Sequence, residues 1–81
     1  MNKDNLVKMA NNIGSFFDSD PDREAAIEGV KDHLKRFWEL RMRIAIIDHF
    51  HQGGEGLSET VKSAVSRLAK DQAKLVHSGD G

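Results

Sequence analysis

The spacing of apolar residues is the feature of this sequence that most constrains its fold. Apolar side chains recur at intervals of three and four residues in every long segment, and no segment shows the alternation that indicates a β-strand. In the first segment, for example, Leu6, Ala10 and Ile13 fall on one helical face. The sequence therefore predicts an all-α fold.

The pattern predicts a small bundle of about four helical segments. Their approximate bounds are residues 4–17, 21–37, 39–52 and 58–76. Because 81 residues give room for one domain, we expect a single helical domain over residues 1–81, with a frayed N-terminus (1–3) and a C-terminal tail (77–81).

The ends of these segments carry residues that favour helix caps. Polar N-cap candidates precede three segments: Asn2 or Asp4, Asp20 before Pro21, and Ser58. Gly53 is the candidate left-handed cap at the end of the third segment. Periodicity leaves open whether residues 39–52 continue the preceding helix or follow a kink near Trp38 and Glu39.

Composition limits the classes of partner. The chain has 12 Lys+Arg against 13 Asp+Glu and no Cys, which argues against general nucleic-acid or anionic-membrane binding and excludes zinc fingers and iron–sulfur ligation by this chain. Its longest apolar run, residues 44–47, is far too short to cross a bilayer. We expect a soluble cytoplasmic protein that binds neither nucleic acid nor membrane.

The titratable residues form no recognisable catalytic or metal-binding pattern. His49 and His51 are two residues apart and point in nearly opposite directions on a helix, so they cannot share a metal ion. The acidic residues 18–24 do not fit a calcium loop, and the glycine-rich residues 53–56 lack the context of a phosphate-binding loop. The sequence therefore predicts no catalytic, cofactor-binding or metal-binding residue.

The stretch Lys35–Arg43 is the strongest functional signal from the residues themselves. It holds four cations and one acid, interleaved with aromatic residues and Met, which are types enriched at protein interfaces. Three interpretations stay open. Phe37 and Trp38 fill the core; or Arg41 and Arg43 bind carboxylates or carbonyls of a protein partner; or a helix-turn-helix-like pair contacts a nucleic-acid backbone.

Three blocks of the sequence also stand in a characteristic order. They are Leu6–Phe17, the region from Ile27 to Arg43 (with His33-Leu34, Phe37-Trp38 and Arg41-Met42-Arg43), and Gly53–Leu57. Together they cover roughly residues 4–68, and they resemble the delta subunit of soluble NAD-dependent formate dehydrogenases.

The resemblance implies a small cofactor-free subunit of a cytoplasmic molybdenum enzyme. In that family the alpha subunit carries a molybdopterin centre and iron–sulfur clusters, while the beta and gamma subunits carry FMN, the NAD site and further clusters. Formate is oxidised at molybdenum and the electrons pass to NAD. The delta subunit would dock on the alpha subunit, and through it join the beta and gamma subunits, to aid assembly or stability.

The chain departs from the family pattern at Leu40, where relatives commonly have proline. Proline would force a helix break at this point, whereas leucine permits either a kinked or a continuous helix. The departure leaves the local geometry open.

Seven residues are the candidates for the protein interface. They are Phe16, Phe17, Phe37, Trp38, Arg41, Met42 and Arg43. Two other functions stay open: a dissociable assembly chaperone for the same enzyme, and a small helical nucleic-acid-binding regulator. A homodimer of the isolated chain, hiding the same apolar surface, stays open as well.

Overall fold

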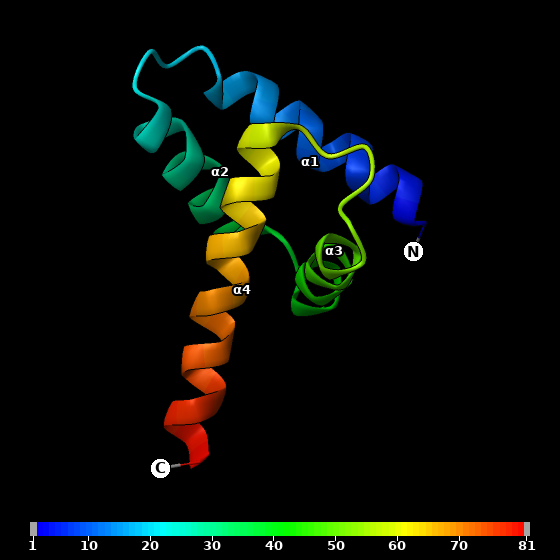
Figure 1. The fold of residues 1–81 in the computed structure, drawn as a ribbon, viewed down its shortest axis with the longest axis vertical. Helices are drawn as coiled ribbons and strands as arrows, with labels where there is room; N and C mark the ends of the chain where they lie inside the picture. The colour runs from blue at the N-terminus through cyan, green and yellow to red at the C-terminus, as the bar shows by residue number, and fades with distance from the viewer. Residues whose placement is uncertain (1, 81) are drawn as a thin grey trace.

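The computed structural model describes the backbone of residues 2–80 and the side chains of residues 2–73. It contains four helices: α1 (Lys3–Phe17), α2 (Arg23–Phe37), α3 (Leu40–His51) and α4 (Glu59–Asp80). The described residues include no β-strand, and Figure 1 shows the resulting bundle. The predicted all-α fold of four helical segments is confirmed.

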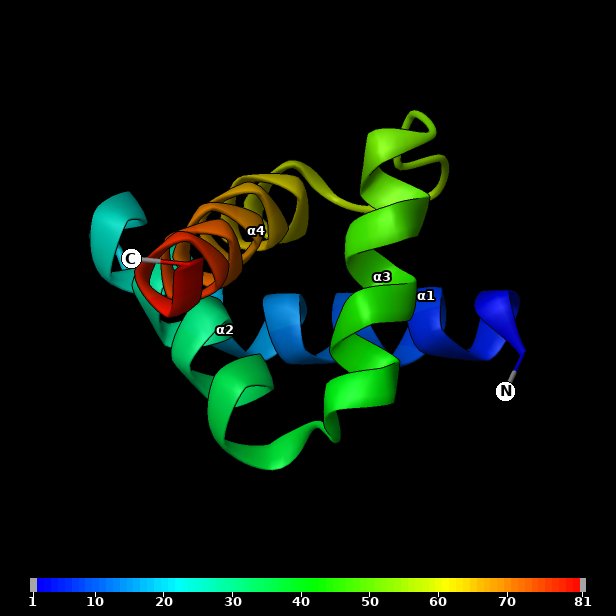
Figure 2. The same cartoon turned by 90° about the horizontal axis from the view of Figure 1, so that it is seen from below.

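The helices cross one another at steep angles. Helix α4 packs most extensively against α2, and α1 contacts all three other helices. Figure 1 shows α1 lying across one end of α4, whose other end extends beyond the rest of the bundle. Figure 2 shows α3 crossing α1 nearer the N-terminal end of α1, with α2 nearer its other end. The described residues include no helix with both the length and the apolar character that crossing a membrane requires.

The core lies where the apolar faces of the four helices meet. Its buried members come from every helix and from the two connections that flank α3: Leu6, Ala10, Ile27, Val30, Leu34, Trp38, Ile46, Leu57, Val61, Ala64, Val65 and Leu68. Burying such side chains stabilises a fold by about 1.5–3 kcal/mol for each large one. Apolar residues that recur at helical spacing in the sequence therefore form the packed core.

Two of the predicted N-caps are confirmed. Asn2 Oδ1 accepts a hydrogen bond of 2.8 Å from the N–H of Asp4 at the start of α1. Ser58 Oγ accepts one of 3.3 Å from the N–H of Val61 at the start of α4. Each bond satisfies a backbone donor that the helix itself leaves unpaired.

The predicted start of α2 is wrong by two residues. Asp22, not Asp20, is the N-cap, because Asp22 Oδ1 accepts from the backbone N–H groups of Glu24 and Ala25 at 3.0 and 3.4 Å. Asp20 instead accepts from the N–H of Asp22 at 2.9 Å. This bond closes a turn around Pro21, so the helix begins only after that turn.

Helices α2 and α3 are separate. The backbone is extended at Trp38 (φ −87°, ψ 136°) and at Glu39 (φ −63°, ψ 154°), so neither residue continues α2. Leu40 is the first residue of α3. The break therefore forms without a proline, and the ring of Trp38 enters the core at this corner.

The connection from α3 to α4 depends on glycine. Gly54 has φ +64°, in the left-handed region, and its N–H donates to the carbonyl of His49 at 3.0 Å. The predicted cap residue Gly53 also has a positive φ, +119°. Helix α4 continues past residue 76, where the apolar pattern ends, to Asp80, and the fraying of the termini stays a prediction.

Candidate functional site

Four aromatic rings form a continuous row across α1 and α2, which we call the aromatic row. It consists of Phe16, Phe17, His33 and Phe37. The Phe16 and Phe17 rings meet edge to face with centroids 5.1 Å apart, Phe17 and His33 lie 6.3 Å apart, and His33 and Phe37 lie 4.8 Å apart. Edge-to-face contacts of this kind are favourable beyond the area they bury. Each ring thereby helps to hold the next.

The two ends of the aromatic row are exposed to solvent. Phe16 is 73% exposed and Phe37 is 71% exposed, whereas Phe17 and His33 are half-buried. Phe17 also packs against the core. The row therefore has exposed phenyl groups at both ends and half-buried rings between them, which is the composition of a protein-docking surface.

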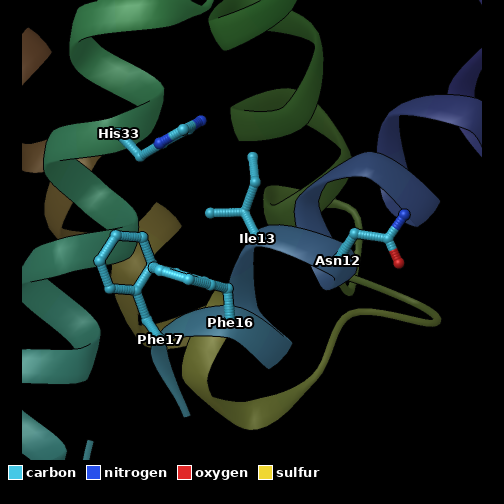
Figure 3. Close-up of a pocket in the computed structure, with 5 residues that line it drawn as sticks. All are labelled: Asn12, Ile13, Phe16, Phe17 and His33. Atoms are coloured by element: carbon cyan, nitrogen blue, oxygen red, sulfur yellow. The ribbon is translucent and has the colours of Figure 1, made fainter. Parts of the chain in front are cut away.

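Two hollows flank the middle of the row. The first has a volume of about 370 Å³ and is lined by Asn12, Ile13, Phe16, Phe17 and His33. Figure 3 shows Ile13 and His33 on one side of it, the two phenyl rings beside them, and Asn12 pointing away. The second has a volume of about 320 Å³ and is lined by Phe17, Gly29, Asp32, His33, Arg36 and Phe37.

Helix α2 approaches the row closely because it has glycine at position 29. The ring of Phe17 lies directly against the backbone of Gly29, in the space that a larger residue would fill. Glycine inside a helix costs about 0.5–1 kcal/mol relative to alanine. At position 29 the absence of a side chain gives the ring of Phe17 room to lie between α1 and α2.

The corner between α2 and α3 carries three arginines, which we call the basic corner. It consists of Arg36, Arg41 and Arg43. Arg36 and Arg41 are exposed and Arg43 is half-buried, and no ion pair joins any of them to an acid among the described side chains. The Nε atom of Arg43 is buried and has no hydrogen-bond partner within that part of the chain.

The face between α2 and α4 uses its charges differently. Arg67 on α4 bonds to Glu24 at 2.6 Å and to Glu28 at 2.8 Å. Lys31 bonds to Glu28 at 3.1 Å and to Asp71 at 3.3 Å. The hydrogen bonds from Arg67 lower the pKa of both glutamates and raise the pKa of Arg67 itself.

The structure separates the seven sequence candidates into two groups. Phe16, Phe17 and Phe37 come together in the aromatic row, with Arg41 and Arg43 in the neighbouring basic corner. Trp38 is only 6% exposed and belongs to the core, and Met42 is partly buried against the core. The core interpretation therefore describes Trp38, while it does not describe Phe37.

The sequence interpretation missed His33 as a member of the row. The signal was present, because His33 and Phe37 are four residues apart and helical residues at that spacing share a face. The sequence does not show how the helices pack on one another. Only the packing of α1 on α2 brings Phe17 from the other helix against His33.

The remaining candidates for chemistry are the other histidines and any group of metal-binding side chains. His49 Nε2 donates to the carbonyl of Glu55 at 2.8 Å, which ties the end of α3 to the glycine-rich connection. No group of three or more His, Asp or Glu side chains is placed to hold a metal ion within the described part of the chain. His77 lies outside the described side chains.

The comparison with known protein families identifies one family. The profile of one protein family, the NADH-dependent formate dehydrogenase delta subunit FdsD, matches residues 5–65. That range includes most of α1, all of α2 and α3, the aromatic row and the basic corner. No curated protein and no solved structure matches the chain. Because the profile covers more than half of the sequence, the chain belongs to the family of formate dehydrogenase delta subunits.

Proposed function

We propose that the chain is a non-catalytic accessory subunit of a cytoplasmic NADH-dependent formate dehydrogenase. It docks on the molybdenum-bearing alpha subunit, through which it joins the beta and gamma subunits, and aids assembly or stability of the complex. The molybdopterin, iron–sulfur clusters, FMN and NAD site belong to those partner subunits in this proposal. Family membership supports the complex, and the aromatic row supplies the contact.

The observation that carries the proposal is the exposure of Phe16 and Phe37. A phenyl ring that is more than 70% exposed leaves most of its apolar area in water, where its burial by a partner is favourable by about 25 cal/mol for each Å². Exposed apolar residues are common on protein surfaces, and Met9, Leu40 and Ile44 are such residues here. The row differs because its rings touch one another and border two hollows.

The first test is a mild affinity purification of the tagged protein from its own cells. Mass spectrometry identifies the chains in the eluate, and a formate–NAD assay measures activity. Recovery of molybdenum, iron–sulfur and flavin subunits in fixed ratio, with activity, is the expected result. Recovery of an inactive molybdenum subunit alone would favour the dissociable chaperone, and recovery of the chain with none of these subunits would contradict the proposal.

The second test asks whether the aromatic row makes the contact. The variant Phe16→Ala/Phe37→Ala removes two exposed rings, so it should fold normally. We expect it to weaken association with the enzyme by at least about tenfold, as loss of aromatic anchors does at other interfaces. Ile44→Ala is the matched control, because Ile44 is 52% exposed and lies outside the row. Association of the double variant as tight as that of the natural chain would remove the row from the interface.

A further inference from the structure

We infer that the partner surface opposite the basic corner carries carboxylate side chains, set beside the apolar residue that covers the aromatic row. The inference rests on the proposed function, because it describes the chemistry of the partner at that same docking surface. It commits to an acidic segment of the partner polypeptide. Three observations support it.

The first observation is the distribution of paired and unpaired charge along α2. Lys31 and Lys35 already have acidic partners, since both approach Asp71 on α4 at 3.3 and 3.7 Å. Directly after Lys35, the charge of Arg36 has no such partner among the described side chains. The acids of the α2–α4 face therefore pair with cations of the same chain. The arginines of the basic corner are available to an acidic side chain of a partner.

The second observation is the position of the basic corner relative to the aromatic row. Arg36 lines the same hollow as Phe17, His33 and Phe37. Arg41 is four residues after Phe37, so their Cα atoms lie no more than about 14 Å apart along the chain. A single segment of a partner can therefore contact the apolar row and the arginines together.

The third observation is the beginning of α3. Its N-cap residue Glu39 makes no side-chain hydrogen bond to the helix. The first N–H groups of a helix carry a partial positive charge that favours a nearby anion. This charge adds to that of Arg41 and Arg43 in the first turns of α3, whereas Glu39 and Asp32 are the only acids between residues 32 and 43.

A phosphate backbone is the other anion that three arginines could meet. The net charge of −1 opposes it, because nucleic-acid binding draws on a broad positive field around the protein. The exposed phenyl groups next to the corner also suit an apolar side chain of a protein. The partner is therefore an acidic polypeptide in this inference, and nucleic-acid binding becomes an outcome of the test.

The test measures reassociation of the purified chain with enzyme prepared from cells that lack it. Affinity is recorded over a range of salt concentrations for the natural chain and for Arg36→Glu/Arg41→Glu. We expect the affinity of the natural chain to fall as salt rises. The double reversal should weaken binding at least about tenfold at low salt and should abolish or invert the salt dependence, because like charges then face each other and added salt screens their repulsion.

Two further variants keep the result interpretable. Lys8→Glu/Arg23→Glu changes the net charge by the same amount at exposed positions away from the corner, and it should bind within about threefold of the natural chain. Arg36→Gln/Arg41→Gln removes charge without reversal, and it should give an intermediate loss. Circular dichroism checks that every variant is helical.

The outcomes separate this inference from the proposed function. If the natural chain binds the enzyme but the corner variants behave like the control, the inference is overturned while the proposed function stands. If the natural chain does not bind the enzyme at all, both are overturned. Salt-dependent binding of a short duplex DNA in place of the enzyme would also overturn the inference.

Discussion

The ring of Phe17 occupies the place that a side chain at position 29 would need. A Cβ atom added to Gly29 would lie 2.6 Å from Cε1 of Phe17, closer than real Cβ contacts come. The two residues are on different helices, α1 and α2, and both line the second hollow beside the aromatic row. The approach of these helices and the position of the row thus depend on one missing methyl group.

We expect Gly29→Ala to destabilise the protein, although alanine is the better helix former. Overpacking costs about 1–3 kcal/mol, which exceeds the 0.5–1 kcal/mol or so that alanine gains in a helix. Chemical denaturation should show a net loss of about 1 kcal/mol. Ala25→Gly, at an exposed position of the same helix, measures the propensity effect alone. A stabilised Gly29→Ala protein would mean that Phe17 moves away freely.

Asn11 should contribute far more to stability than its neighbour Asn12. Asn11 Oδ1 accepts from the N–H of Ser58 at 3.0 Å, and its Nδ2 donates to the carbonyl of Gly56 at 2.8 Å. Asn11→Ala leaves both backbone groups unpaired and should cost about 1–2 kcal/mol in free energy of unfolding. Asn12→Ala should change that free energy by less than about 0.5 kcal/mol. Similar losses for the two variants would show that these bonds contribute little.

Leu40→Pro should be tolerated, because the backbone around this residue already suits proline. Leu40 is the first residue of α3 and Glu39 is extended, as the residue before a proline must be. We expect the free energy of unfolding to change by less than about 1 kcal/mol. Ile44→Pro is the matched control, with nearly the same exposure, and it should cost about 3 kcal/mol or more inside the helix. Unfolding of both variants would count against the described corner.

Arg67→Gln should lower the melting temperature at neutral pH and have less effect in acid. Arg67 lowers the pKa of Glu24 and Glu28 below their ordinary value of 4.5. A lowered pKa in the folded state gives stability that is present above pH 4.5 and is lost as pH falls through the folded value. The melting temperatures of the two proteins should therefore converge below that pH.

The control for this titration is Arg23→Gln. Arg23 is exposed, and it forms no ion pair with the described side chains. Its substitution should shift the melting temperature little, and by a similar amount at every pH. If the difference between the natural protein and Arg67→Gln stayed constant through the acid range, the two glutamates would not be coupled to Arg67.

The helices could be predicted from the sequence because each one buries a regular apolar face. Leu6 and Ala10 on α1, and Val30 and Leu34 on α2, lie at helical spacing and are all buried. The start of α2 could not be predicted to the residue. Asp20 and Asp22 are equally good caps by type, and the choice depends on which carboxylate reaches two free N–H groups.

The candidate site could be predicted only in part. Phe37 and Trp38 are neighbours of similar character, yet one is 71% exposed and the other 6%. The extended backbone at Trp38 makes this difference, and periodicity carries no information about a break that no glycine or proline marks. Likewise, His33 joins the row only because α1 brings Phe17 against it.

The contacts between neighbouring rings of the aromatic row affect the entropy lost when a partner binds. Each ring is already held by its neighbour, so the loss of rotamer freedom on binding, about 0.5–1.5 kcal/mol for a mobile side chain, is largely avoided. The same readiness makes the row adhesive toward any apolar surface. A chain made in excess of its partner would keep Phe16 and Phe37 exposed, and these rings could contact other chains that also lack a partner. Synthesis of the chain and its partner in matched amounts would therefore protect the chain from aggregation.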